Sequence, residues 1–264
     1  MGKRYMKEGN FKLIEKEDLY DFGQVWRLRF EAPDIEAEPG QFVNIAVDGQ
    51  FLRRPISVSE YEEGILSLVV QPVGEGTRRL VSLPRGSRVN MLTGLGNRFS
   101  LPSREGKVVL LLGGGVGYAP LVGLMKKIVA ESEYVPFAVF GFNGEADVPL
   151  NHIQELRDEG FPVEYCTMTG EMGDNGNALE VMQEYIDHYS LDPAFFYTCG
   201  PLPMMRAVCR AFDFEGQVSM EARMGCGFGA CMGCTIPTPA GPRRICKEGP
   251  VFYKSEILQY FESL

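Results

Sequence analysis

The stretch "VVLLLGGGVGYAPL", residues 108–121, joins an apolar run to a cluster of glycines. The apolar run is typical of a strand buried in a parallel sheet, and the glycines predict a tight turn into a helix. Backbone amides at the start of that helix would favour a pyrophosphate group, bound near Gly114, Gly115 and Gly117. The dinucleotide motif G-x-G-x-x-G has a third glycine where this chain has Pro120, so a tight turn without a ligand remains an alternative.

The segment after this turn alternates strands with helices. Apolar runs predict strands at 107–113, 136–142, 162–168 and 195–200, with helical spacing between them. Asp147 could cap a helix that ends near Gly160, and Asn177 with Glu180 resembles a capping box. This order predicts a nucleotide-binding α/β domain with a parallel sheet over residues 104–215.

A second turn follows the last of these strands, in "TCGPLPMM" at 198–205. The carboxyl ends of parallel strands lie at one edge of a sheet, where ligands bind. We therefore expect Cys199, Gly200 and Pro201 to meet the glycine turn at 114–117.

Residues 1–103 follow a different pattern, in which short β-rich runs are separated by turns. The runs lie at 42–47, 55–59, 65–73 and 87–92, and they predict a small antiparallel barrel or sandwich. "RRPIS" at 53–57 and "VVQPVGEGT" at 69–77 offer Arg54, Ser57, Gly76 and Thr77 as an anion-binding group. The alternative is an exposed cationic strand end beside an ordinary turn.

Neither pattern continues after about Gly216, and residues 216–264 are rich in glycine, proline and cysteine. Their spacing is Cys226-x4-Cys231-x2-Cys234-x11-Cys246, the order typical of a plant-type 2Fe-2S cluster. A structural zinc site usually has two C-x2-C pairs, and this segment has one. Zinc, disulfides and free thiols remain alternatives to the cluster. Because the segment holds little apolar material, we expect a bound group to organise it.

The composition limits the possible partners. The chain has 264 residues, enough for two or three domains, and 26 basic against 35 acidic residues give a net charge of -9. That charge disfavours nucleic acid and anionic membrane surfaces. Glycines and Pro120 interrupt the one long uncharged run, so we expect no membrane helix there. Seven cysteines and no evident secretory signal predict a reducing cytoplasm.

Together these motifs resemble the ferredoxin-NADP reductase superfamily, over nearly the whole chain. Its members join an FAD-binding β-barrel to a nicotinamide-binding α/β domain. Their FAD motif R-x-Y-S aligns with residues 54–57, where isoleucine replaces the tyrosine that flanks the flavin ring. The resemblance implies FAD contacts from Arg54, Pro55, Ile56, Ser57, Val69, Val70, Gln71, Gly76 and Thr77. It implies nicotinamide contacts from Gly114, Gly115, Gly117, Cys199, Gly200 and Pro201.

Within that superfamily, the cysteine spacing and the trailing "CKEGPVF" at 246–252 are similar to the electron-transfer subunits of type B dihydroorotate dehydrogenase. This resemblance implies an oxidoreductase subunit of pyrimidine biosynthesis with one FAD, NAD as electron acceptor and a C-terminal 2Fe-2S domain. The cluster ligands would be Cys226, Cys231, Cys234 and Cys246. Ser57 and Cys199 would be the catalytic residues, beside the flavin ring and the nicotinamide. The implied partner is an FMN-containing catalytic subunit, in a heterotetramer of two plus two.

Other functions remain open from the sequence. One is a related flavin subunit of a hydrogenase or a ferredoxin-dependent transhydrogenase, and another is a non-catalytic zinc-binding scaffold. Glu145 and Asp147, with no arginine nearby, suit the ribose hydroxyls of NAD better than the 2'-phosphate of NADP. Alternatively, these acids lie on a solvated loop, where Asp147 caps the next helix.

Overall fold

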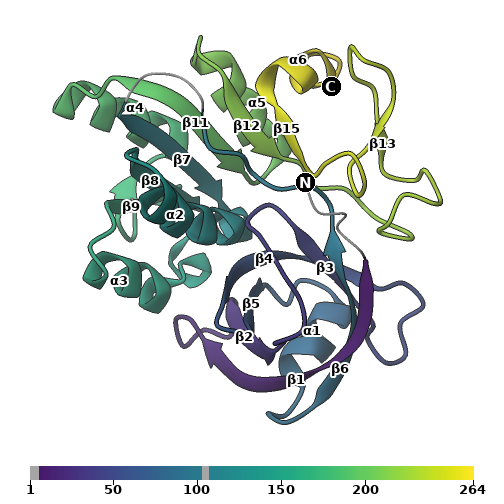
Figure 1. Ribbon diagram of the computed structural model, residues 1–264. Helices are drawn as coiled ribbons and strands as arrows, with labels where there is room; N and C mark the ends of the chain where they lie inside the picture. The colour runs from purple at the N-terminus through teal and green to yellow at the C-terminus, as the bar shows by residue number, and fades with distance from the viewer. Residues whose placement is uncertain (1–5, 103–106) are drawn as a thin grey trace.

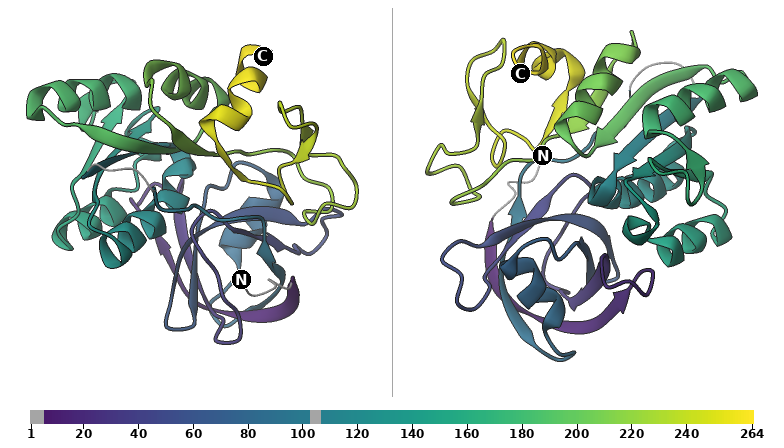
Figure 2. Two further views of the ribbon diagram at one scale, coloured as in Figure 1. Left: turned by 45° about the horizontal axis from the view of Figure 1, so that its top comes forward. Right: turned by 180° about the vertical axis from the view of Figure 1, so that it is seen from behind.

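The computed structural model of the chain describes residues 6–102 and 107–264. A barrel, a helix-covered sheet and a cysteine-rich region pack against one another (Figures 1 and 2). The predicted fold class is confirmed: an antiparallel barrel, a parallel-sheet nucleotide-binding domain and a C-terminal cysteine-rich region. The expected boundary at 103/104 lies outside the described residues.

The N-terminal part is a closed barrel with the strand order β1-β2-β5-β4-β3-β6 and antiparallel neighbours. Leu28 and Phe30 of β2 lie opposite Leu68 and Leu66 of β5, and all four side chains are fully buried in the barrel core. Helix α1, between β5 and β6, adds Leu80 to this core. The elements are β1 (Lys7–Asp18), β2 (Trp26–Glu31), β3 (Phe42–Ile45), β4 (Arg54–Glu62), β5 (Ile65–Val70), α1 (Glu75–Ser82) and β6 (Arg88–Leu95).

The second part is a seven-stranded sheet, within the described residues, of order β10-β9-β8-β7-β11-β12-β15. All neighbouring strands are parallel except β12 and β15. The strands are β7 (Val108–Gly114), β8 (Val135–Phe142), β9 (Val163–Thr167), β10 (Asp174–Asn175), β11 (Pro193–Cys199), β12 (Gly216–Ser219) and β15 (Val251–Tyr253). The helices are α2 (Ala119–Glu131), α3 (Leu150–Asp158), α4 (Ala178–Tyr189), α5 (Leu202–Ala211) and α6 (Lys254–Glu262), with short 3-10 turns at η1 (Gly115–Tyr118) and η2 (Glu145–Asp147).

The side chains of β7 alternate between two cores. Val109 and Leu111 pack with α2 and α3, whereas Leu110 and Leu112 pack with α4, α5 and α6. Because both faces of the strand are covered, its sequence is an unbroken apolar run. This is why residues 108–112 indicate a parallel sheet without any helical or alternating pattern of their own.

Two local predictions have different outcomes. Asn177 does cap α4, since its Oδ1 accepts from the amides of Leu179 and Glu180, both at 3.1 Å. Asp147 does not cap α3: the helix starts at Leu150 after Pro149, and the Asp147 carboxylate accepts instead from Gln71. The predicted cap is wrong because α3 begins three residues after Asp147, with Pro149 at the N-cap position. The carboxylate bonds a barrel residue instead, which local sequence could not reveal.

The strand pattern also continues past Gly216, contrary to expectation. β12 pairs in parallel with β11, and β15 then pairs with β12 in the antiparallel sense. Between them lies a loop region with one two-stranded ribbon, β13 (Thr235–Ile236) and β14 (Arg243–Arg244). The C-terminal region therefore uses the edge of the sheet as part of its support.

Candidate functional site

Two cavities adjoin one another where the barrel, the sheet and the C-terminal region meet. The first, called here the barrel cavity, has a volume of about 260 Å³, and the second, the sheet cavity, about 340 Å³. Gln71, Val116 and Glu221 line both of them. A ligand in one cavity would therefore lie beside a ligand in the other.

The barrel cavity brings together most of the residues expected to contact FAD. Its wall is formed by the start of β4, the end of β5 and the start of α1, and it includes Pro55, Ile56, Ser57, Val69, Val70, Gln71 and Thr77. Met220, Ala222, Met224 and Pro250 form the opposite wall, so the C-terminal region closes the cavity. The lining is mainly apolar, which suits a flat aromatic ring system.

Arg54 and Gly76 do not line this cavity, but they lie against each other beside its lining residues Pro55 and Thr77. A Cβ on Gly76 would approach the Arg54 Nε to 2.4 Å, so only glycine lets the guanidinium lie against α1. Arg54 donates to the Leu52 carbonyl and to Gln50 Oε1, each at 2.5 Å. The predicted phosphate-binding residues thus converge, with the guanidinium held by the loop before β4.

The sheet cavity brings together the residues expected to bind the nicotinamide nucleotide. Gly114, Gly115, Gly117, Gly200 and Pro201 all line it. A Cβ on Gly117 would come within 2.5 Å of the Cys199 carbonyl oxygen, so the turn packs directly against the end of β11. Glycine is therefore required at position 117 by packing as well as by any ligand.

Cys199, at the end of β11, does not line either cavity. Its side chain is fully buried, and burial raises the pKa of its thiol well above the usual range. It pairs with Gly113 on one side and with Ser219 on the other, and Ser219 lines the barrel cavity. The thiol thus lies one residue behind the cavity wall.

Sequence reasoning missed Glu221, which lines both cavities. Its side chain is accessible from the empty cavities but surrounded by protein, and this desolvation raises the pKa of the carboxyl group. A carboxyl group with a raised pKa in a cleft is a candidate for proton transfer. No motif distinguishes it, because it is a single acid between β12 and the cysteines.

The four predicted ligand cysteines lie in one region as two pairs. The Cys226 thiol accepts from the amides of Ala230 and Cys231, at 3.2 and 3.5 Å, and the Cys246 amide donates to the Cys234 sulfur at 3.4 Å. Burial opposes ionisation of Cys226, but hydrogen bonds from backbone amides outweigh it and lower its pKa to about 6. Burial and the neighbouring Cys234 raise the pKa of Cys246 to about 12.

This arrangement bears on the kind of metal centre. Across residues 6–102 and 107–264, no three His, Cys, Asp or Glu side chains are grouped so that they could hold one metal ion. Two pairs of thiols suit a two-iron cluster, in which each iron takes two cysteines, better than a single zinc ion. Amides already directed at a ligand sulfur would also stabilise the negative charge of such a cluster.

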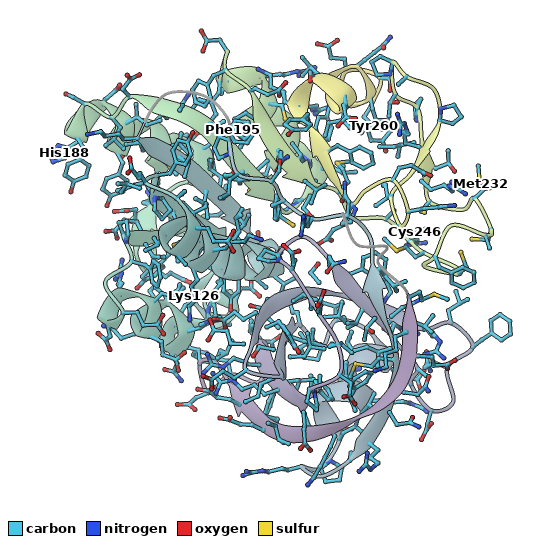
Figure 3. All side chains as sticks on the ribbon, viewed as in Figure 1. Lys126, His188, Phe195, Met232, Cys246 and Tyr260 are labelled. Carbon is cyan, nitrogen blue, oxygen red and sulfur yellow. The ribbon has the colours of Figure 1, made fainter. Side chains whose placement is uncertain are left out.

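The two pairs differ in exposure. Cys234 and Cys246 are buried, whereas Cys231 is exposed at the outer surface of the loop, next to Met232. Figure 3 shows Met232 at the outer edge of this loop and Cys246 nearer the barrel. The cysteine region therefore extends from the barrel side of the molecule to its surface.

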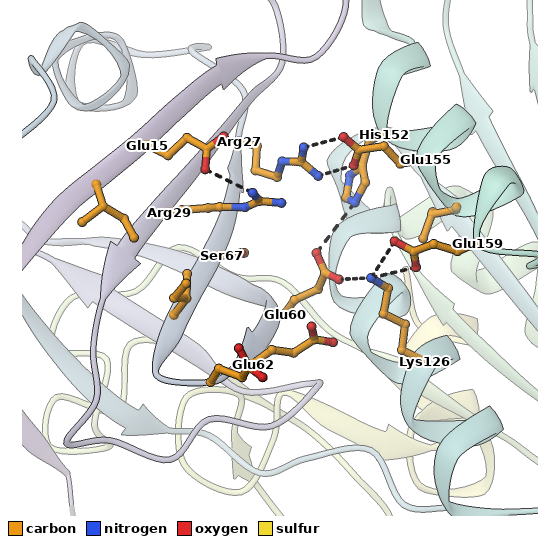
Figure 4. A pocket seen from close by; sticks show the side chains of 14 residues that line it. Glu15, Arg27, Arg29, Glu60, Glu62, Ser67, Lys126, His152, Glu155 and Glu159 are labelled. Atoms are coloured by element: carbon orange, nitrogen blue, oxygen red, sulfur yellow. Dashed lines mark hydrogen bonds and ion pairs between the residues drawn. The ribbon is translucent and has the colours of Figure 1, made fainter.

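A third, polar cavity of about 300 Å³ lies on another side of the molecule, between the barrel and helices α2 and α3 (Figure 4). Arg27 is 4% exposed and binds Glu17 and Glu155, which ties β2 to α3. His152 is 1% exposed and its Nδ1 is 2.9 Å from the Tyr118 hydroxyl. Burial and the Arg27 charge lower the pKa of His152 to about 3, so it is neutral at ordinary pH. This cavity contains none of the predicted site residues.

Comparisons with known proteins agree with this geometry. Residues 111–210 match the family described as the oxidoreductase NAD-binding domain, and residues 221–258 match the iron-sulfur cluster binding domain of dihydroorotate dehydrogenase B. The structure is similar to that of an NADH-dependent reduced ferredoxin-NADP oxidoreductase, with a TM-score of 0.79, 24% identity and coverage of 94% of this chain and 89% of that chain. An Amycolatopsis cytochrome P450 reductase has a TM-score of 0.64 at 24% identity, over 80% of this chain and 66% of that chain.

A barrel, a nicotinamide-type α/β domain and a cavity at their junction define an oxidoreductase of the ferredoxin-NADP reductase superfamily. Two relatives, both electron transfer subunits of dihydroorotate dehydrogenase B (NAD(+)), are more specific. One, from Caldanaerobacter subterraneus, is 34% identical over 89% of this chain and 93% of its own length. The other, from Shouchella clausii, is 33% identical over 96% and 98%. The chain belongs to this family of electron transfer subunits, with an iron-sulfur binding region and an NAD-binding domain. No described helix is long and apolar enough to span a membrane.

Proposed function

We propose that the chain passes electrons between an FMN-containing dihydroorotate dehydrogenase subunit and NAD, through a 2Fe-2S cluster and FAD. The observation that carries the proposal is the position of the barrel cavity. It shares three lining residues with the sheet cavity, and its opposite wall belongs to the region that holds the cysteines. A flavin there can exchange a two-electron hydride with a nicotinamide and single electrons with an iron-sulfur cluster.

The residues have distinct roles in this proposal. The flavin ring would be held by Pro55, Ile56 and Ser57, with the Ser57 hydroxyl as the nearby hydrogen-bonding group. The cavity wall at the end of β5 is formed by Val69, Val70 and Gln71. Arg54, Gly76 and Thr77 would bind the diphosphate at the start of α1. There the Thr77 hydroxyl now bonds Gly74 at 3.1 Å. Gly114, Gly115, Gly117, Gly200 and Pro201 would hold the nicotinamide nucleotide.

Cys199 and Glu221 have supporting positions around the reacting rings. Cys199 is behind the wall, so we assign it to packing the nicotinamide end of the site. Glu221 lies at the junction of both cavities, where its carboxyl group can give or take a proton. Asp147 lines the sheet cavity and is free of nearby arginines in sequence, which supports NAD as the acceptor.

Cys226, Cys231, Cys234 and Cys246 would ligate the cluster as two pairs. The exposed side chains of Phe228 and Met232 flank Cys231, so a partner subunit can approach the cluster directly. The domain assignment that follows is FAD binding by residues 1–103, NAD binding by 104–215 and the cluster by 216–264. The strands of 216–219 and 251–253 serve the sheet as well.

The test is anaerobic purification of the chain from its native host, followed by assay of the eluate for dihydroorotate-dependent NAD reduction. The assay is combined with flavin identification, iron and sulfide analysis, and mass measurement of the complex. An FMN subunit that co-elutes at equal amount, with FAD, two irons per chain and NAD reduction, would support the proposal. Flavin and iron without dihydroorotate oxidation would contradict the pyrimidine assignment, and zinc in place of iron would contradict the electron path.

A further inference from the structure

We infer that two barrel asparagines, Asn44 and Asn97, are positioning residues that fix the cysteine region relative to the barrel cavity. The inference rests on the proposed function, because the distance between the FAD and the cluster matters only if electrons pass between them. Each asparagine holds a different arm of the cysteine region. The first arm carries Cys226, and the second runs from Cys246 to Val251.

Asn44 holds the arm that carries Cys226. It lies on β3, is 1% exposed, and donates from Nδ2 to the Cys226 carbonyl at 3.1 Å. Gly227 has a φ of +77°, and a Cβ there would approach Asn44 Nδ2 to 2.4 Å. The ligand loop therefore lies directly on the asparagine, and its glycine allows both the backbone conformation and the close approach.

The position of Asn44 on the strand links it to the barrel cavity. Asn44 pairs with Pro55 across β3 and β4, and Pro55 lines that cavity. Phe42, two residues earlier on the same face, lines the cavity and packs in one core with Cys234 and Cys246. The outer face of β3 is thus shared between the barrel cavity and the cysteine region.

The hydrogen bonding of Asn44 indicates that its side chain serves to hold the loop. Its Oδ1 is buried and has no hydrogen-bond partner among the described residues. Leaving a buried acceptor unpaired is unfavourable, and an apolar residue at this buried position would avoid that cost. The side chain is explained by what its Nδ2 does for the loop.

Asn97 holds the arm that carries Cys246. Its Nδ2 donates to the carbonyls of Glu248 and Val251, at 3.1 and 2.7 Å, and its Oδ1 accepts from the Val251 amide at 2.9 Å. Its own amide donates to the Gly249 carbonyl at 2.6 Å. The segment that Asn97 binds, residues 248–251, begins two residues after Cys246 and includes Pro250, which lines the barrel cavity.

The experiment compares Asn44→Ala and Asn97→Ala with the wild-type holoprotein and with Asn90→Ala. Asn90 is a matched control, because it is a barrel asparagine whose Nδ2 bonds Asn10, also in the barrel, at 3.3 Å, and whose Oδ1 has no partner among the residues that the structure describes. The measurements are FAD and iron content, the electron paramagnetic resonance spectrum of the dithionite-reduced cluster, and iron release to a chelator. Stopped-flow mixing with NADH then gives separate rates for flavin reduction and cluster reduction.

We expect flavin reduction within about twofold of wild type, together with an altered resonance spectrum. Cluster reduction should be slower, and iron release faster, by about 10- to 100-fold, the range typical of residues that support metal ligands. Wild-type spectra and rates in both asparagine variants would overturn the inference. A wild-type protein without a two-iron spectrum would overturn the proposed function and this inference with it. If the alanine variants fail to fold, Asn44→Leu and Asn97→Asp give the same test, since each removes the donor and keeps most of the volume.

Discussion

Gly123 on α2 should set the distance between the barrel and the nucleotide domain. A Cβ at this position would lie 2.3 Å from the carbonyl oxygen of Ser59 on β4, where ordinary contact begins at 3.4 Å. Gly123→Ala must therefore separate α2 from β4 by about 1 Å, since neither atom belongs to a flexible side chain. The Ser59 hydroxyl, which donates to the Ala119 carbonyl at 3.1 Å, would be strained by the same movement.

The expected magnitudes follow from that displacement. Overpacking of this kind costs about 2 kcal/mol, which lowers the melting temperature of a chain of this size by about 4–8 °C. Val116 in η1 and Ala119 at the start of α2 line the barrel cavity, so the cavity should widen. A misplacement of about 1 Å can slow a transfer reaction by about 100-fold. We expect flavin reduction by NADH to fall by roughly 10- to 100-fold.

The assay is stopped-flow reduction of the flavin by NADH, together with thermal unfolding of the holoprotein. Val129→Ala is the control, because Val129 lies on the same helix but is 53% exposed. It should leave both the rate and the melting temperature near those of wild type. A Gly123→Ala protein that melts at a lower temperature but reduces its flavin at the wild-type rate would refute the functional argument. A Gly123→Ala protein with the melting temperature of wild type would refute the steric argument.

Three further predictions test other parts of the molecule. His152 has a pKa of about 3 when folded, below its usual 6.5, so only the unfolded chain gains this proton as pH falls below 6.5. Stability should therefore decline by about 2 kcal/mol between pH 7.5 and pH 5, and His152→Leu, but not His188→Leu, should flatten that decline in thermal unfolding. Glu221→Gln should slow flavin reduction by about 100-fold with FAD and iron retained, and a normal rate would remove Glu221 from proton transfer. Cys231→Ser should lose the visible absorption of the cluster, and its retention would contradict the ligand assignment.

The sequence predicted most of the strands and turns that have a local pattern of apolar residues and glycines. The apolar run before the glycine turn indicated a strand covered on both faces, and β7 is buried on both faces. Apolar runs predicted the barrel strands β3 to β6, but no run was assigned to β1 or β2. The twelve residues of β1 include only Phe11 and Leu13 as buried positions. Most of β1 is charged and faces solvent, so its composition does not indicate a strand. It is a strand because its backbone pairs with β2 on one side and β6 on the other.

Contacts between distant segments were beyond the sequence. Asp147 is a plausible helix cap locally, but Gln71, 76 positions earlier in the chain, takes its carboxylate. The pKa of Glu221 is raised by desolvation at the junction of the two cavities, which only the packed barrel and sheet create. The complete burial of Cys199 at the end of β11 likewise depends on the glycine turn that packs against its backbone. Each of these outcomes depends on how the three parts pack, which no motif encodes.

The same packing explains how a C-terminal region with little core of its own can be ordered. Its two ends are strands of the sheet, β12 and β15, and its middle lies on Asn44 and on the outer face of β3. Cys234 and Cys246 accordingly belong to a core that also contains Phe42 of the barrel and Phe196 of the sheet. A cluster bound there would not have to organise the whole region, as composition alone suggested, because the barrel and the sheet already fix both arms. The barrel cavity is closed by that same region, so its wall is complete only when the C-terminal part is folded.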